Sequence, residues 1–219
     1  MRSVKQLVAL MLVIGWALPA AQAQESTVAY SADFSFETAE MAYTGKVFAA
    51  PGKERRESVF EAGMTSVTIR REDLGKLWIL MPSERMYMEV APGQSDPSGM
   101  QSSSPDDYAV EMTVVGPEQL DGMDAIKHKV IMTDADGNKM GGFWWVSNEG
   151  IPLKMDMLAV EEGSKMRLKQ QLSNVVLETQ PAELFEIPSD YTSLNMGMGM
   201  GIGQGMLGLP AQGQDDDDD

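Results

Sequence analysis

The feature that most constrains this chain is a regular alternation of apolar and polar residues from residue 28 onward. In residues 28–36, one side of an extended segment carries Val28, Tyr30, Ala32, Phe34 and Phe36. The other side carries Thr27, Ser31, Asp33 and Ser35. This two-residue period is typical of a β-strand with one buried and one solvated face, whereas an amphipathic helix repeats every three to four residues.

The same period returns along the chain and predicts a mainly β protein built on one large antiparallel sheet. The further strand candidates are residues 41–50, 55–60, 65–69, 77–81, 86–90, 108–114, 126–132, 143–146, 151–157 and 166–177. A sheet with one apolar face must cover that face with a second layer, with helices or with a ligand. Few short helices are expected, the best over residues 181–185 with Pro181 in its first turn. This shortage of covering elements favours a binding protein over a catalyst.

Short turns separate most of these segments, but residues 91–107 are different. They are rich in Pro, Gly and Ser and have no periodicity, which predicts a flexible loop. We interpret this loop as an excursion between two halves of one sheet, within a single domain spanning residues 24–194. Two separate domains are the alternative interpretation.

The first 23 residues have the pattern of a secretory signal peptide. Arg2 and Lys5 precede an apolar run at residues 7–18, and residues 21–23 read Ala-Gln-Ala, a small-x-small cleavage pattern. The apolar run is too short to form a stable transmembrane anchor. We therefore expect a periplasmic protein that is released after export.

The charge balance excludes one class of partner. The chain has 33 acidic and 17 basic residues, a formal net charge of −16. Such a surface repels nucleic acid, and no basic patch interleaved with aromatic residues is present, so we expect no nucleic-acid binding. The chain has no cysteine, so its stability must come from its core rather than from disulfides.

The last 25 residues form a low-complexity tail. Residues 195–219 combine a Met/Gly-rich stretch with a terminal run of five Asp residues and cannot bury a core, so we expect disorder. Thioethers in an exported, flexible segment can bind copper(I), a soft ion, which makes a weak metal site the alternative interpretation of this tail. Its candidate ligands are Met196, Met198, Met200 and Met206.

Candidates for catalysis are few. His128 is the only histidine, and it shares a strand face with Ile126, Val130 and Met132. No nucleophile or metal set accompanies it in the sequence, so a packed histidine is favoured over an acid/base or a ligand. We predict that the protein is not an enzyme, has no catalytic residues and needs no cofactor.

Several longer motifs resemble a known family. They lie at residues 75–82 (Gly-Lys-Leu-Trp-Ile-Leu-Met-Pro), 86–89, 122–130, 143–146 (Phe-Trp-Trp-Val), 150–154 and 180–191 (Gln-Pro-Ala-Glu-Leu-Phe-Glu-Ile-Pro-Ser-Asp-Tyr). Together they are similar to the domain-of-unknown-function family 4412, a relative of the bacterial LolA/LolB-like lipoprotein carriers. The resemblance covers roughly residues 28–194, which is nearly all of the mature domain. It implies a half-open antiparallel barrel whose concave apolar face holds acyl chains.

Large apolar side chains on the strands are the candidates for lining that face. The predicted ligand-binding set is Phe34, Tyr43, Trp78, Tyr87, Trp145 and Met155. Ordinary core packing is the alternative for each of them. Trp144 and Trp145 are adjacent and must point to opposite faces of a regular strand, so at most one lines the cavity.

These expectations combine into one function. The sequence predicts an exported soluble binding protein that holds a lipid acyl chain or a lipoprotein in an apolar half-barrel. Flexible methionine side chains on the strands suit a surface that adapts to varied apolar ligands. The alternatives are a periplasmic copper(I)-binding protein that uses the tail, and an envelope sensor or scaffold that binds a protein partner without cargo.

Overall fold

The computed structural model describes residues 28–60, 63–90, 108–135, 137–161 and 164–194. The expected signal peptide, the 91–107 loop and the 195–219 tail lie outside these residues, and so do the four tail methionines. In the described part, twelve strands form one sheet in the order β12-β6-β5-β4-β3-β2-β1-β11-β10-β9-β8-β7. The strands are β1 Tyr30–Glu37, β2 Ala42–Ala50, β3 Lys53–Phe60, β4 Thr65–Arg71, β5 Lys76–Met81, β6 Met86–Val90, β7 Ala109–Leu120, β8 Met123–Thr133, β9 Lys139–Ser147, β10 Pro152–Glu161, β11 Ser164–Leu177 and β12 Thr192–Ser193.

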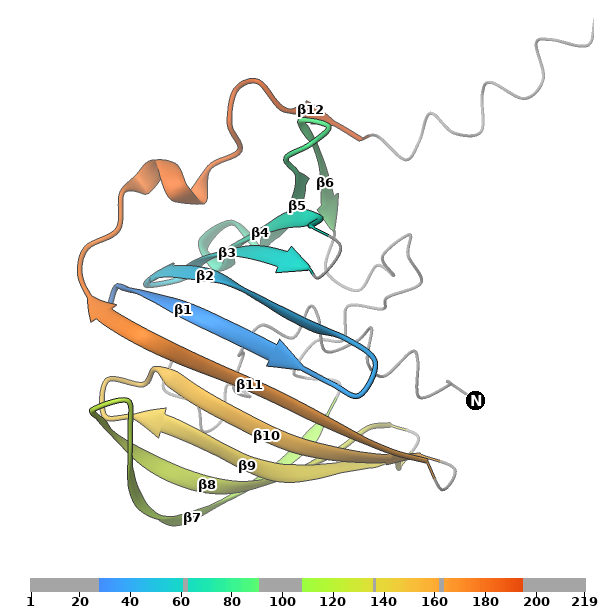
Figure 1. Ribbon diagram of the computed structural model, residues 1–219, viewed down its shortest axis with the longest axis vertical. Coiled ribbons are helices and arrows are strands. Elements are labelled where there is room, and N and C mark those ends of the chain that lie inside the picture. Colours follow the sequence, from blue (N-terminus) through green and yellow to red (C-terminus); the bar gives the residue numbers. More distant parts are fainter. Residues whose placement is uncertain (1–27, 61–62, 91–107, 136, 162–163, 195–219) are drawn as a thin grey trace, which may run out of the picture.

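The sheet is curved and open (Figure 1). All neighbouring strands are antiparallel except β12, which pairs with β6 in parallel. The edge strands β12 and β7 stand at opposite ends of the order and do not close a barrel. The prediction of a mainly β fold with a single curved antiparallel sheet is therefore confirmed. Strands from both sides of residues 91–107 belong to this sheet, because β1 pairs with β11.

One strand is longer than the sequence predicted. The strand candidate over residues 108–114 stops before Gly116 and Pro117, but β7 continues through them to Leu120. The pairing with β8 shifts register between Val114 and Gly116, which marks a bulge. Because β7 is an edge strand, Pro117 can lack its backbone donor without breaking a ladder on both sides. The turn lies instead at Asp121 and Gly122, which both have positive φ.

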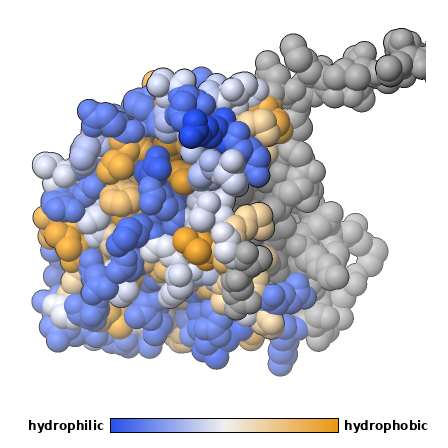
Figure 2. All heavy atoms as spheres, turned by 45° about the horizontal axis from the view of Figure 1, so that its top comes forward, coloured by the Kyte–Doolittle hydropathy of each residue, from blue (hydrophilic) through white to orange (hydrophobic). Residues whose placement is uncertain are grey.

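The helical content is two short 3-10 turns in the described part, η1 Glu72–Leu74 and η3 Ala182–Phe185. The helix predicted over residues 181–185 thus exists, as a 3-10 turn that starts after Pro181. No helix among the described residues is long and apolar enough to cross a membrane. In the space-filling view, hydrophilic residues predominate on the visible face, and apolar residues gather there only in small groups (Figure 2).

The buried apolar residues form two clusters. The large cluster spans β1, β2 and β8–β11, and the small one combines β4 and β5 with η3. Directly opposed residues of neighbouring strands share a face, so the register shows where each cluster lies. Val47 of the large cluster opposes Arg56 of β3, whereas Ile69 of the small cluster opposes Arg55. Arg55 and Arg56 are adjacent, so the small cluster lies on the face opposite to Val47 and the other β1 and β2 members of the large cluster.

The chain after β11 covers the small cluster. Phe185 is 1% exposed and packs among Val67, Ile69, Trp78 and Leu80. The Arg55 guanidinium donates a hydrogen bond to the Leu184 carbonyl oxygen, at 3.2 Å. Arg71 donates to the Phe185 carbonyl oxygen and to the Glu186 carboxylate. The C-terminal segment, residues 181–194, is thereby held on this face, and β12 extends its attachment to β6.

Candidate functional site

The face that carries most of the large cluster is opposite to the one that η3 contacts, and it is the inner face of the curved sheet (Figure 1). We call it the concave face. Its buried members from β1 and β2 are Tyr30, Ala32, Phe34, Phe36, Tyr43, Val47 and Ala49. Those from β8–β11 include Val130, Met132, Met140, Trp144, Met157, Ala159, Leu168 and Leu172. In the described part of the chain, no helix or second sheet packs on this face, since η3 contacts β3 and β4 from the other side.

One row of side chains crosses the concave face from strand to strand. The register aligns His128 of β8, Trp144 of β9, Met155 of β10, Gln170 of β11, Phe36 of β1, Tyr43 of β2 and Phe60 of β3. Neighbouring strands lie about 4.8 Å apart, so these side chains are consecutive neighbours along the row. The row is polar at one end and aromatic at the other.

The aromatic end is closely packed. The Tyr43 ring stacks on Phe36 with centroids 4.7 Å apart and contacts Phe60 at 5.0 Å. Phe34 meets Tyr43 edge to face at 5.9 Å. Gly45 allows this packing, because a Cβ there would lie 2.8 Å from the Phe34 ring and still closer to the Glu57 carbonyl oxygen. Burial raises the pKa of Tyr43 to about 12, so its phenol stays protonated at neutral pH.

Charged residues occupy the concave face beside this aromatic end. Glu54, which is 9% exposed, accepts a hydrogen bond from Arg56 at 2.8 Å, and Arg70 lies 3.9 Å from the same carboxylate. The Arg56 guanidinium also lies over the Phe34 ring, 5.6 Å from its centroid. Burial alone would raise the pKa of the Glu54 carboxyl, but attraction to Arg56 and Arg70 outweighs burial and lowers that pKa. Glu54 therefore stays ionised although it is buried.

The polar end of the row contains two atoms without hydrogen-bond partners. Both the Trp144 indole Nε1 and the His128 Nδ1 are buried in the described structure and bond to nothing. Trp144 is 6% exposed, and it is a cross-strand neighbour of His128 and of Met155. Buried polar atoms normally have a partner, so an unsatisfied indole donor on an apolar face points to an acceptor supplied by a ligand.

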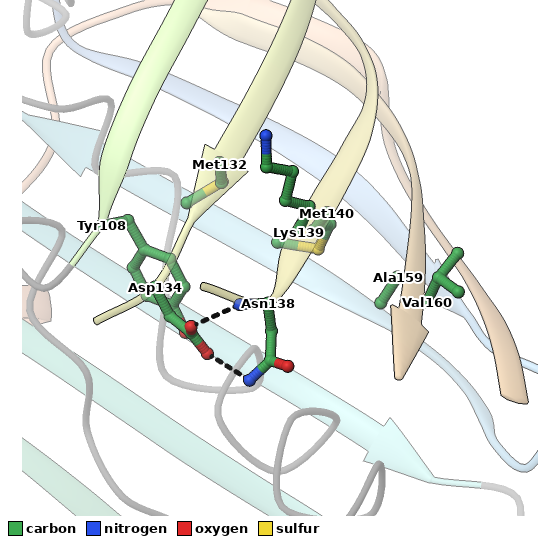
Figure 3. Close-up of a pocket in the computed structure, with 8 residues that line it drawn as sticks. All are labelled: Tyr108, Met132, Asp134, Asn138, Lys139, Met140, Ala159 and Val160. Atoms are coloured by element: carbon green, nitrogen blue, oxygen red, sulfur yellow. Dashed lines mark hydrogen bonds between the residues drawn. The ribbon is translucent and has the colours of Figure 1, made fainter. Parts of the chain in front are cut away.

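Methionines line the end of the concave face near the β8–β9 turn. Met132 and Met140 oppose each other on β8 and β9, and both are 4% exposed. In Figure 3 their side chains lie between Tyr108 on one side and Ala159 on the other, around a small pocket. Asp134 lies at the edge of this pocket. Its carboxylate accepts a hydrogen bond from the Asn138 backbone N–H at 2.8 Å and another from the Asn138 side-chain amide at 2.9 Å (Figure 3). These hydrogen bonds stabilise the turn between β8 and β9.

The structure brings together three of the six predicted ligand-binding residues. Phe34 and Tyr43 are buried on the concave face, and the half-buried Met155 packs against other members of the same cluster, three strands away from Tyr43. Binding by these three residues stays a prediction. The side chains of Trp78, Tyr87 and Trp145 lie on the opposite face of the sheet, although Trp145 is buried at the border of the large cluster.

Trp78 and Tyr87 lie on the opposite face of the sheet, in the small cluster beneath Phe185. The Trp78 indole donates a hydrogen bond to Glu89 at 2.9 Å, which satisfies its polar atom there. Two-residue alternation assigns side chains to two faces but does not tell which face is concave. These two residues therefore contribute to attachment of the C-terminal segment rather than to the concave face.

Trp145 points away from its neighbour Trp144, as adjacent residues of a strand must. Its indole donates a hydrogen bond to Glu118, and the ammonium groups of Lys127 and Lys154 lie 4.8 and 4.9 Å from its ring centroid. The ring is thus enclosed by charged groups on the outer face. Trp144 is the tryptophan on the concave face.

The sequence reasoning missed Glu54, Arg56 and Trp144. A signal for the first two was present, because residues 54, 56 and 58 of β3 are polar where the alternation calls for apolar side chains. No group of three or more His, Cys, Asp or Glu residues is arranged to hold a metal ion in the described part.

No model of a known protein family matches the sequence, and no curated protein matches it. Membership of the family named above therefore stays a prediction. Solved structures with a similar arrangement of strands include MucB in complex with MucA(peri), with 17% identity, 86% of this chain and 61% of that chain covered, and a TM-score of 0.44. This chain thus spans less than two thirds of MucB.

Two further similarities are weaker. An outer membrane lipoprotein-sorting protein domain from Vibrio parahaemolyticus has 12% identity, with 76% of this chain and 92% of that chain covered and a TM-score of 0.34. The Mycobacterium tuberculosis lipoprotein LppX has 7% identity, with 82% and 99% covered and a TM-score of 0.38. At such identities and scores, the function has to be inferred from the residues of this chain itself.

Proposed function

We propose that this chain is an exported binding protein that holds a lipid acyl chain, free or attached to a lipoprotein, against its concave face. The observation that carries the proposal is the continuous apolar concave face, to which β1, β2 and β8–β11 contribute. Export rests on the signal-peptide pattern of residues 1–23.

The energetics of burial support an acyl ligand. Each methylene transferred from water to an apolar surface contributes about 0.8 kcal/mol, so a long acyl chain of about sixteen methylenes contributes about 13 kcal/mol before association costs. Those costs are themselves several kcal/mol, which leaves room for micromolar affinity. The concave face needs no charged partner for this interaction.

The chemistry of the lining favours a ligand without one rigid shape. Met132, Met140 and Met157 are buried on the concave face, and Met155 is half-buried there. Unbranched thioether side chains repack at low cost around chains of different length and branching. A rigid aromatic cluster at Phe36 and Tyr43 forms the other part of the surface.

The test is direct. The full chain, exported to a bacterial periplasm and purified without detergent, should release lipid on organic extraction. It should also bind a fluorescent fatty acid with micromolar affinity. Met155→Gln, on the concave face, is expected to weaken that affinity about tenfold, since it replaces an apolar contact with an amide.

Leu158→Gln is the matched control on the same strand, because Leu158 is 40% exposed on the outer face. It should leave the affinity unchanged. An extract free of lipid together with no probe binding would contradict the proposal. Equal effects of the two substitutions would place the ligand elsewhere than on the concave face.

A further inference from the structure

Two polar atoms on the concave face, Trp144 Nε1 and His128 Nδ1, lack hydrogen-bond partners among the described residues and therefore bear on the chemistry of the ligand. Trp144 lies on the concave face, its side chain is more than nine-tenths buried, and its Nε1 lacks an acceptor among the described residues. An indole nitrogen can only donate. A purely hydrocarbon ligand would leave this buried donor unsatisfied, which is unfavourable for the complex.

His128 strengthens the inference because it is the direct cross-strand neighbour of Trp144. Its Nδ1 is buried and also lacks a partner. A neutral imidazole can present Nδ1 either as a donor or as an acceptor. A carbonyl oxygen has two lone pairs and can accept from both side chains, whereas a hydrocarbon chain can satisfy neither.

The neighbours of this pair are suited to the rest of such a ligand. Met155 follows Trp144 in the row across the sheet, and the aromatic end of the row lies farther along it at Phe36 and Tyr43. The two unsatisfied atoms are thus at one end of an otherwise mainly apolar row. A molecule with an oxygen acceptor at the start of an acyl chain matches this order.

We infer that the ligand is an acyl lipid whose carbonyl oxygen accepts a hydrogen bond from the Trp144 indole, with His128 as a second polar contact. The inference rests on the proposed function and narrows it from any apolar chain to a carbonyl-bearing one. An ester lipid and a free fatty acid both present this carbonyl-type oxygen, and the experiment separates them.

The experiment compares three probes by displacement of a fluorescent fatty acid from the full chain: dioctanoylglycerol, its dioctyl ether analogue without carbonyl groups, and decanoic acid. Trp144→Phe keeps the ring but removes the N–H. It should weaken binding of the ester about five- to tenfold, the range expected for one lost hydrogen bond, and leave the ether unchanged. A parallel loss for decanoic acid identifies the free acid as a ligand, and a loss confined to the ester identifies an ester lipid.

Trp145→Phe is the matched control, because that indole donates to Glu118 on the outer face. It should change none of the three affinities. His128→Leu should weaken ester binding, while His128→Gln, which keeps a polar group, should weaken it less. These variants test the inference independently if Trp144→Phe folds poorly.

Two outcomes are distinguishable. If the wild-type chain binds ester and ether alike and Trp144→Phe changes neither, the carbonyl contact is overturned while the proposed lipid binding stands. If the wild-type chain binds none of the probes and carries no lipid from the periplasm, the proposed function fails and this inference fails with it.

Discussion

Strands β8–β11 and strands β4–β5 belong to the same sheet, yet their buried apolar side chains lie on opposite faces of it. In β8–β11, most of the buried apolar side chains face the concave side, Trp145 and Ala125 being exceptions, and no described element covers that side. In β4 and β5, they face the outer side, where Phe185 and its neighbours cover them. We call these two parts the C-terminal wing and the N-terminal wing.

The buried apolar side chains change from one face of the sheet to the other at β3. Its inward residues include Glu54 and Arg56, where β1 and β2 place aromatic and aliphatic side chains. An ion pair held by several charge-assisted hydrogen bonds can be buried, but it offers little to an acyl chain. The N-terminal wing therefore uses its buried apolar residues for its own stability, whereas the C-terminal wing leaves most of its buried apolar residues on the face proposed for the ligand.

The largest effect on stability is expected from removal of the buried Glu54 carboxylate. Glu54→Ala leaves Arg56 without its 2.8 Å partner and is expected to lower the free energy of unfolding by about 3–5 kcal/mol. Urea denaturation measures the change. Glu57→Ala, on the other face of β3, removes a carboxylate that is 40% exposed and bonded to Arg55, and should cost under about 1 kcal/mol. Equal losses would contradict the distinction between the faces.

A somewhat smaller effect is expected from the covered apolar face of the N-terminal wing. Phe185→Ala should lower the free energy of unfolding by about 3 kcal/mol, the lower end for a buried phenylalanine, because the C-terminal segment can partly relax. Affinity for the fluorescent fatty acid should stay unchanged, since Phe185 lies on the opposite face from the concave one. Glu183→Ala, exposed on the same turn, is the control. A loss of binding with Phe185→Ala would show that the two faces are coupled.

The buried carboxylate of Glu54 should also influence how the stability of the protein depends on pH. The pKa of Glu54 is lowered in the folded state, so its contribution is fully present above the ordinary pKa of a glutamate. It is lost as the pH falls from that range through the lowered pKa. Glu54→Gln should therefore flatten the dependence of unfolding free energy on pH across this acidic window, with little change of slope above it. An unchanged slope on acidification would assign the acid sensitivity to other carboxylates.

The smallest expected effect concerns the outer face of the C-terminal wing. Trp145→Phe removes the hydrogen bond to Glu118 while keeping an aromatic ring beneath Lys127 and Lys154. The unfolding free energy should fall by about 1 kcal/mol, which thermal denaturation detects. A fall of several kcal/mol in the unfolding free energy would mean that the Trp145–Glu118 hydrogen bond stabilises this wing as much as buried packing on the concave face does.

Much of the fold could be predicted from the local pattern of the chain. Most strand spans, the hairpin between β5 and β6, and the turn at residues 182–185 follow from alternation and from Pro and Gly positions. The end of β7 was missed because Gly116 and Pro117 usually mark a turn, and only its position at the edge of the sheet lets the strand continue.

The candidate site was predicted only in part. Phe34, Tyr43 and Met155 lie on the concave face, whereas Trp78, Tyr87 and Trp145 point to the other face. Their alternation has the same period on either face, and no local signal tells which face is concave. That choice depends on the pairing of β2 with β3 and on the C-terminal segment that packs on β4, both of which join residues far apart in the chain.

By itself, then, the sequence determined that the chain forms strands with one apolar face and too few helices to cover it, because a two-residue period is a local property of each segment. The tertiary structure alone decided that the apolar face changes sides across β3, that Glu54 is buried beside Arg56, and that Trp144 rather than Trp145 faces inward. The physical reason is that burial, pairing and charge compensation depend on strand register and on curvature, which no single segment contains.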